Sequence, residues 1–236
     1  MNLYSLHDKP HELDHYKRSQ EIPQILVSGV KREIYSYHGI KDYTVKALKD
    51  KEHILIKDAD AAYHYYVAHP DRLGKRWPEA EPAFAKDGWI SLEYARAIKD
   101  RFPDGEDAIA KNAMQSLAYA NDVLHGRFPK GEKAIATNPT AACDYAIFLT
   151  RKPFPEGEDA IATDGYKSLE YAKLVLRGRF KKGEKAILNT ESPNLCAEYA
   201  VEVLGHRWPE AESLILPYAA TNTYAKTYVR EFDIKL

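Results

Sequence analysis

The hydrophobic and polar positions of this chain repeat with a period of about 26 residues, and each period predicts two short helices. In six successive segments an aromatic residue is followed four positions later by a glutamate, and the aromatics are 25, 26, 26, 26 and 28 residues apart. The aromatics are Trp77, Phe102, Phe128, Phe154, Phe180 and Trp208, and the glutamates are Glu81, Glu106, Glu132, Glu158, Glu184 and Glu212. A period this regular predicts an array of one small structural unit.

The unit that begins at Phe154 shows what each period encodes. Pro155 suits the first position of a helix, where its missing N–H is not needed, and a short apolar run follows at 160–162. Residues 163–165 interrupt this helix, and apolar residues then recur in two adjacent stripes from 167 to 176, which predicts a second helix buried on more than one side. Such a helical hairpin is too small to bury its own apolar face, so it must stack on its neighbours.

A small residue always stands three positions after the aromatic. It is glycine after the four phenylalanines and alanine after the two tryptophans. Alanine is poor at positive φ, so the position predicts a small residue in helical conformation beside a crossing helix. The pairing of tryptophan with alanine has two explanations: the two side chains share a packing site, or the first and last clear units differ because they cap the array.

The second helix carries a repeated tyrosine followed by alanine, at Tyr94, Tyr119, Tyr145, Tyr171 and Tyr199, and Tyr224 extends the series. Asn138-Pro139 and Ser192-Pro193 each offer a capping residue followed by proline at the first helical turn.

An arginine stands directly before most of the aromatics, at Arg76, Arg101, Arg127, Arg179 and Arg207. We expect these arginines to pair with the repeated glutamates of their own or neighbouring units. The alternative is a basic stripe that meets phosphates, as in modular RNA-reading repeats.

The predicted fold is all-α, a solenoid-like stack of helical hairpins, with a regular array over 71–236 and degenerate repeats over 1–70. Glu52 precedes Tyr65 by the same 13 residues that separate Glu106 from Tyr119. The β-branched stretches 25–27 and 53–56 could instead form short strands. Irregular parts of a solenoid often carry its specific contacts. We therefore expect partner contacts at Tyr63, His64 and Tyr66, and along the arginine row.

Composition narrows the function further. The 236 residues carry 34 basic and 35 acidic side chains, a net charge of -1, so bulk charge gives no footprint for nucleic acid or an anionic membrane. No stretch approaches the length of a membrane span and the N-terminus lacks a secretory pattern, so we expect a cytoplasmic protein. Cys143 and Cys196 lie two repeats apart, too far for a disulfide, and should be free, buried thiols. The sequence predicts no cofactor.

One short motif points to enzyme chemistry. His11-Glu12-Leu13-Asp14-His15 matches the pattern in which two histidines bind zinc and the glutamate acts as general base. Asp14 puts a charge where zinc peptidases usually have none, and no third ligand follows at a familiar spacing. We expect an exposed, charged helix there. The zinc hydrolase remains an alternative.

The unit R-[FW]-P-E-[GA]-E-x-A-I resembles a tandem helical repeat of uncharacterised proteins of tailed bacteriophages, over about Arg76 to Tyr224. Trp77–Glu81 and Trp208–Glu212 match its Trp-Pro-Glu-Ala-Glu core most closely. The resemblance implies a phage protein in the host cytoplasm and no catalytic activity. The expected function is thus a non-enzymatic protein-binding scaffold that inhibits or redirects a bacterial protein, such as a defence component. The alternatives are the zinc hydrolase and a repeat protein that binds nucleic acid or a small molecule.

Overall fold

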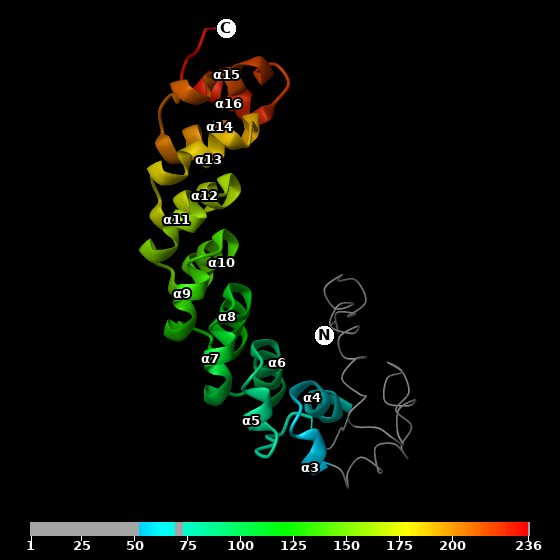
Figure 1. Cartoon of the computed structure of the whole chain (residues 1–236). Helices are drawn as coiled ribbons and strands as arrows, with labels where there is room; N and C mark the ends of the chain where they lie inside the picture. Colours follow the sequence, from blue (N-terminus) through cyan, green and yellow to red (C-terminus); the bar gives the residue numbers. More distant parts are fainter. Residues whose placement is uncertain (1–51, 69–72, 236) are drawn as a thin grey trace.

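The described part of the chain is a curved stack of helical hairpins. The computed structural model describes residues 52–68 and 73–235, and these contain helices and no strand. The hairpins follow one another in sequence order from α3 to α16, and the stack bends along its length (Figure 1). In this view α6, α8, α10 and α12 lie along the inner side of the bend, and α5, α7, α9 and α11 lie along the outer side. The predicted all-α repeat stack is confirmed.

In each hairpin the second helix, counted with any π-helical continuation, is longer than the first. The first helices are α3 (Glu52–Leu55), α5 (Glu81–Phe84), α7 (Glu106–Ile109), α9 (Glu132–Ile135), α11 (Glu158–Ile161), α13 (Glu184–Asn189) and α15 (Glu212–Ile215). The second helices are α4 (Ala59–Ala68), α6 (Gly88–Ile98), α8 (Ala113–Tyr119), α10 (Pro139–Asp144), α12 (Gly165–Tyr171), α14 (Pro193–Glu198) and α16 (Thr223–Glu231). A 3-10 turn such as Pro129–Gly131 connects the aromatic to the first helix, so the proline begins this turn. The second helices are capped as predicted, with Asn138 accepting from the Ala141 N–H at 2.9 Å.

The repeated tyrosine joins the two helices of each unit. The Tyr145 hydroxyl donates to the Glu132 carboxylate at 2.7 Å and accepts the backbone N–H of Phe128 at 3.0 Å. The ring of Tyr145 also packs edge-on against Phe154 of the next unit, with ring centroids 5.4 Å apart. The same three contacts recur with Tyr94, Tyr119, Tyr171 and Tyr199. One side chain thus closes its own hairpin and couples it to the following one.

The small position packs against the second helix of the preceding unit. Gly131 has φ −87° and ψ −14°, and a Cβ placed on it would lie 2.4 Å from the Phe128 ring and 2.7 Å from Ser116. Gly105 and Gly183 face Ser91 and Ser168 in the same way. The helical conformation and the crossing helix are as predicted. The approach of the Phe128 ring also favours a shared packing site as the reason why phenylalanine is paired with glycine.

The difference between 25-residue and 26-residue units lies in the end of the second helix. Phe102 follows Tyr94 by eight residues, and α6 is α-helical to its end at Ile98. Phe128 follows Tyr119 by nine residues, and α8 continues as a π-helical segment, Ala120–Leu124. Similar segments follow α10, α12 and α14, namely Tyr145–Thr150, Ala172–Leu176 and Tyr199–Leu204. A π turn takes in one extra residue without moving the flanking contacts.

The repeat unit that the spacing of Glu52 and Tyr65 predicts is present, because Tyr65 donates to Glu52 at 2.6 Å and 52–68 forms a helical hairpin. Two details differ from the sequence interpretation. The helix α3 covers most of 53–56, so no strand forms there. In the last unit Tyr228, and not Tyr224, binds Glu212 and the Trp208 N–H, because this hairpin has a longer connection. Residues 1–51, including 25–27, lie outside the described residues.

Candidate functional site

The arginine row is engaged by the repeated glutamates. Arg127 binds both carboxylate oxygens of Glu132, at 2.8 and 2.9 Å. Hydrogen bonding to Arg127 is the main reason why the pKa of Glu132 lies below its ordinary value. Arg101, Arg179 and Arg207 make the same two-pronged pair within their own units, and Arg76 binds Glu81 and Asp100. The expected Arg–Glu pairing is therefore present. These arginines remain about half exposed, but each has a carboxylate partner, which weakens the case for a phosphate-binding stripe.

The N-terminal candidate residues have different environments. His64 is exposed and its ring nitrogen lies 2.7 Å from the Asp60 carbonyl oxygen, and Tyr63 is half-buried against Phe84 and Trp89. Tyr66 is fully buried, and its hydroxyl accepts the Gly74 N–H. A partner therefore cannot contact Tyr66, contrary to the prediction. His11, Glu12 and His15 lie outside the described residues.

A set of exposed large apolar residues occupies one register on the second helices, which the sequence interpretation missed. Trp89, Met114, Tyr166 and Tyr224 each stand two residues after the capping residue of their helix. In the first three units this residue lies five positions before the repeated tyrosine. This fixed spacing is the sequence signal that could have identified the row, because the hairpin core does not require an apolar residue at this position.

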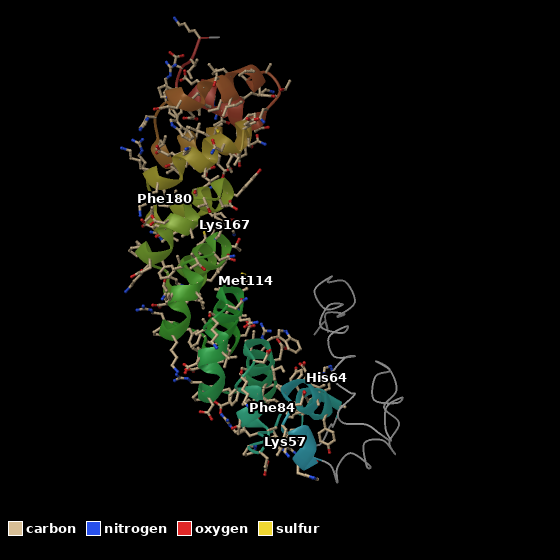
Figure 2. All side chains as sticks on the ribbon, in the orientation of Figure 1. Lys57, His64, Phe84, Met114, Lys167 and Phe180 are labelled. Carbon is tan, nitrogen blue, oxygen red and sulfur yellow. The ribbon has the colours of Figure 1, made fainter. Side chains whose placement is uncertain are left out.

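A second apolar row follows two helical turns further along. Phe148 and Leu174 each stand three residues after the repeated tyrosine and are 64% and 56% exposed. Leu174 follows Tyr166 by eight residues, which is about two turns because part of this stretch is π-helical with more residues per turn, so Tyr166 and Leu174 share a helix face. Figure 2 labels Met114 on the side of the array where the second helices lie, which is the inner side of the bend.

Carboxylates lie between and beside these apolar rows, and three cations each bridge two of them. Lys167 contacts Asp144 at 3.1 Å and Glu170 at 2.8 Å. Arg96 contacts Glu93 at 2.5 Å and also Asp122, and Lys173 contacts Glu202 at 2.7 Å and also Glu198. Burial by itself would lower the pKa of Lys167, but the hydrogen bonds and charges of Glu170 and Asp144 have the larger effect. The net pKa is therefore raised, and Lys167 stays a cation.

We call this surface the inner face. It comprises the apolar residues Trp89, Met114, Phe148, Tyr166 and Leu174, the carboxylates Glu93, Asp122, Asp144, Glu170, Glu198 and Glu202, and the cations Arg96, Lys167 and Lys173. Six carboxylates against three cations leave an excess of three negative charges. Exposed apolar residues in register on a repeat array are typical of a macromolecular binding surface.

A cluster on the inner face has the composition of a metal site. One ligand atom from each of Cys143, Asp144 and Glu170 lies within 4.8 Å of the others. The Lys167 ammonium already contacts both carboxylates, and the Cys143 thiol donates to the Lys167 carbonyl at 3.6 Å. Burial raises the pKa of Cys143 to about 12, which keeps the thiol protonated. The cluster is therefore a lysine-centred ion pair network, and it fits a metal ion poorly.

Both cysteines are free and buried, as expected. Burial raises the pKa of Cys196 to about 11, so neither thiol has the thiolate character of a catalytic nucleophile.

A shallow groove of about 460 Å³ adjoins the first apolar row. Tyr166 and Gly165 form one wall, and Lys185, Asn189 and Thr190 belong to the other. The helix α13, with six residues against four in α11, supplies this second wall. The groove is open to solvent, and its lining mixes Tyr166 and alanines with polar residues and lysines.

The outer side of the array carries a different charge pattern. Lys130 reaches back to Asp107 at 2.8 Å, and Lys182 reaches back to Asp159 at 3.0 Å. Over the four units that begin at Phe102, Phe128, Phe154 and Phe180, acidic residues and lysines alternate at these positions. These exposed pairs join consecutive hairpins and leave little excess charge.

No protein-family model, curated protein or solved structure matches this chain. Within the described residues, no helix is long and apolar enough to cross a membrane.

Proposed function

We propose that this chain is a non-enzymatic scaffold that binds another protein through its inner face. The observation that carries the proposal is the presence of Phe148 and Leu174 at equivalent positions of adjacent units, both more than half exposed. The hairpin core does not require these side chains, because the corresponding residue is Asp122 in one neighbouring unit and Glu202 in the other. A repeat array presents an extended curved surface of this kind to partners.

The resemblance of the repeat to tailed-bacteriophage proteins adds the source of the partner. We propose that the chain acts in the host cytoplasm and inhibits or redirects a bacterial protein, for example a defence component. An enzymatic function has less support, since the ionisable groups of the inner face are held in ion pairs and the buried thiols have raised pKa values.

Affinity capture from a bacterial lysate tests the proposal with three forms of the full chain. The wild type should enrich a specific host protein. The double variant Phe148→Ser/Leu174→Ser should lose it, because both apolar anchors become polar. The control Tyr218→Ser changes an apolar residue that is 50% exposed in the last unit, away from the inner face, and should retain the protein. Equal capture by all three forms would contradict a binding role for the inner face.

A further inference from the structure

The chemistry of the inner face selects among partners. We propose that it takes an amphipathic segment whose polar side is basic, with apolar side chains seated between Phe148, Leu174 and Tyr166 and with lysines or arginines against the neighbouring carboxylates. This inference rests on the proposed binding role of the inner face and specifies the partner's charge.

The three bridging cations leave negative charge on the inner face. Each of Arg96, Lys167 and Lys173 is shared by two carboxylates, so every bridge keeps a net negative charge. Glu170 and Glu202 are 48% and 42% exposed at their side chains, so each has room for a further cation. An acidic partner would meet an excess of like charge at these positions.

The apolar rows and the acidic residues are interleaved along the same helices. In α12 and its π-helical extension, Glu170 lies four residues after Tyr166 and four before Leu174, which places all three on one side. A partner must therefore offer apolar and basic groups side by side, as an amphipathic segment does.

Exposed cations mark the limit of the acidic surface. Lys99, Arg151 and Arg177 stand at the C-terminal ends of their second helices, each in the left-handed conformation. The helix dipole favours a cation there. Arg151 and Arg177 follow the second apolar row by three residues, whereas Asp144 and Glu170 precede it by four. A basic segment can therefore contact these carboxylates on the side of the row away from the two arginines.

Two labelled peptides of equal apolar content test the inference on the full chain. Both are amphipathic and about 20 residues long, roughly 30 Å as a helix; one carries lysine and its twin carries glutamate on the polar side. Fluorescence anisotropy should show the lysine peptide binding at least about tenfold more tightly than its twin, with an affinity that falls as salt is added. Binding of the lysine peptide should weaken in Phe148→Ser/Leu174→Ser and in Glu170→Gln/Glu202→Gln. It should be unchanged in Tyr218→Ser and in Asp159→Asn, whose carboxylate is also exposed and ion-paired but lies on the outer side of the array.

The other outcomes separate this inference from the proposed function. Tighter binding of the glutamate peptide, or no binding of either peptide, would overturn the basic-segment inference. If capture from lysate were still lost in Phe148→Ser/Leu174→Ser, the inner face would remain a docking surface for a different partner. Sedimentation should show a monomer; a dimer abolished by Phe148→Ser/Leu174→Ser would overturn the inference by showing that a second copy occupies the face.

Discussion

The Tyr145 hydroxyl lies 2.7 Å from the Glu132 carboxylate, on the helix that precedes its own. The same oxygen accepts the Phe128 N–H, so one buried phenol satisfies two polar groups of the hairpin. Because the Tyr145 ring also contacts Phe154, loss of this residue affects two units. The contact explains why tyrosine recurs at a position where phenylalanine would fill the same space.

Tyr145→Phe should lower the free energy of unfolding by about 1–3 kcal/mol, because it leaves the Phe128 N–H and the Glu132 carboxylate without a buried partner. Urea denaturation measures the change. Tyr166→Phe removes an exposed hydroxyl with no loss of a core contact and should have little effect. Equal effects of the two substitutions would show that the buried hydroxyl is not structural.

Stability should depend on pH through the repeated glutamates. Hydrogen bonds from Arg127 and Arg207 lower the pKa of Glu132 and Glu212 below the ordinary value of 4.5. A carboxyl group whose pKa is lowered by folding stabilises the fold above its unfolded pKa, and this stabilisation is lost as the pH falls through the folded pKa. The melting temperature should therefore decrease as the pH is lowered below about 4.5.

Glu132→Gln isolates this effect. The variant should be less stable at pH 7, since Arg127 and Tyr145 lose their carboxylate, and its stability should decline less between pH 5 and pH 3 in the range where carboxyl groups titrate. Glu156→Gln, at an exposed position, should follow the wild-type curve. An acid decline that is as steep in Glu132→Gln as in the wild type would contradict the assigned role of the pair.

Gly157→Ala should destabilise the array. A Cβ at this position would lie 2.7 Å from the Ala142 Cβ and 2.7 Å from the Phe154 ring, and such overpacking typically costs about 1–3 kcal/mol. Gly178→Ala is the matched control, because the nearest atom to its Cβ would be 3.9 Å away. Thermal unfolding should separate the two variants; equal melting temperatures would refute the packing account. If the aromatic and the small residue share a site, adding Phe154→Trp should recover part of the loss.

Arg177→Gly should stabilise the chain by about 0.5–1 kcal/mol. Arg177 has φ +51°, a conformation that L side chains disfavour and that glycine adopts freely. Gly205, with φ +67°, occupies the same position in the next unit, and Gly205→Ala should be destabilising by a similar amount. Chemical denaturation of both variants checks the sign, and a loss of stability in Arg177→Gly would contradict the strain argument.

Deletion of Asn121 should be tolerated. It would shorten the step from Tyr119 to Phe128 to the eight residues that separate Tyr94 from Phe102, so the π-helical segment should become α-helical as in α6. The protein should still unfold in one cooperative transition. Deletion of Ala108 is the control, since it changes the spacing of Glu106 from Tyr119 and should destabilise far more. Equal loss from both deletions would count against the π-helical explanation.

The scaffold was largely predictable from the sequence because each unit repeats the same local chemistry. The caps at Asn138 and Ser192, the pairing of Arg127 with Glu132 and the helical small position all follow from residue spacing. The contact of Tyr228 with Glu212 was not predicted, because the longer connection in the last unit places Tyr228, and not Tyr224, opposite the glutamate. Side-chain identity in a repeat predicts a contact only while the connecting length is constant.

The candidate surface was less predictable. The sequence did not single out Phe148 and Leu174, because apolar residues in a predicted helix normally face the interior. The π-helical segments change the rotation per residue over this stretch, so a pattern with an α-helical period cannot identify which apolar residues are exposed. The opposite error affected Tyr66, which is buried although it lies in a polar, tyrosine-rich sequence.

Hydroxyl-radical footprinting of the full chain with and without its captured partner shows whether the inner face is the binding surface. In the complex we expect reduced oxidation of the apolar residues of the inner face, namely Trp89, Met114, Phe148, Tyr166 and Leu174. The apolar residues Leu73 and Tyr218, about half exposed and away from the inner face, should be oxidised equally in both samples. Protection of Leu73 or Tyr218 with unchanged oxidation of the inner face would show that the partner binds elsewhere.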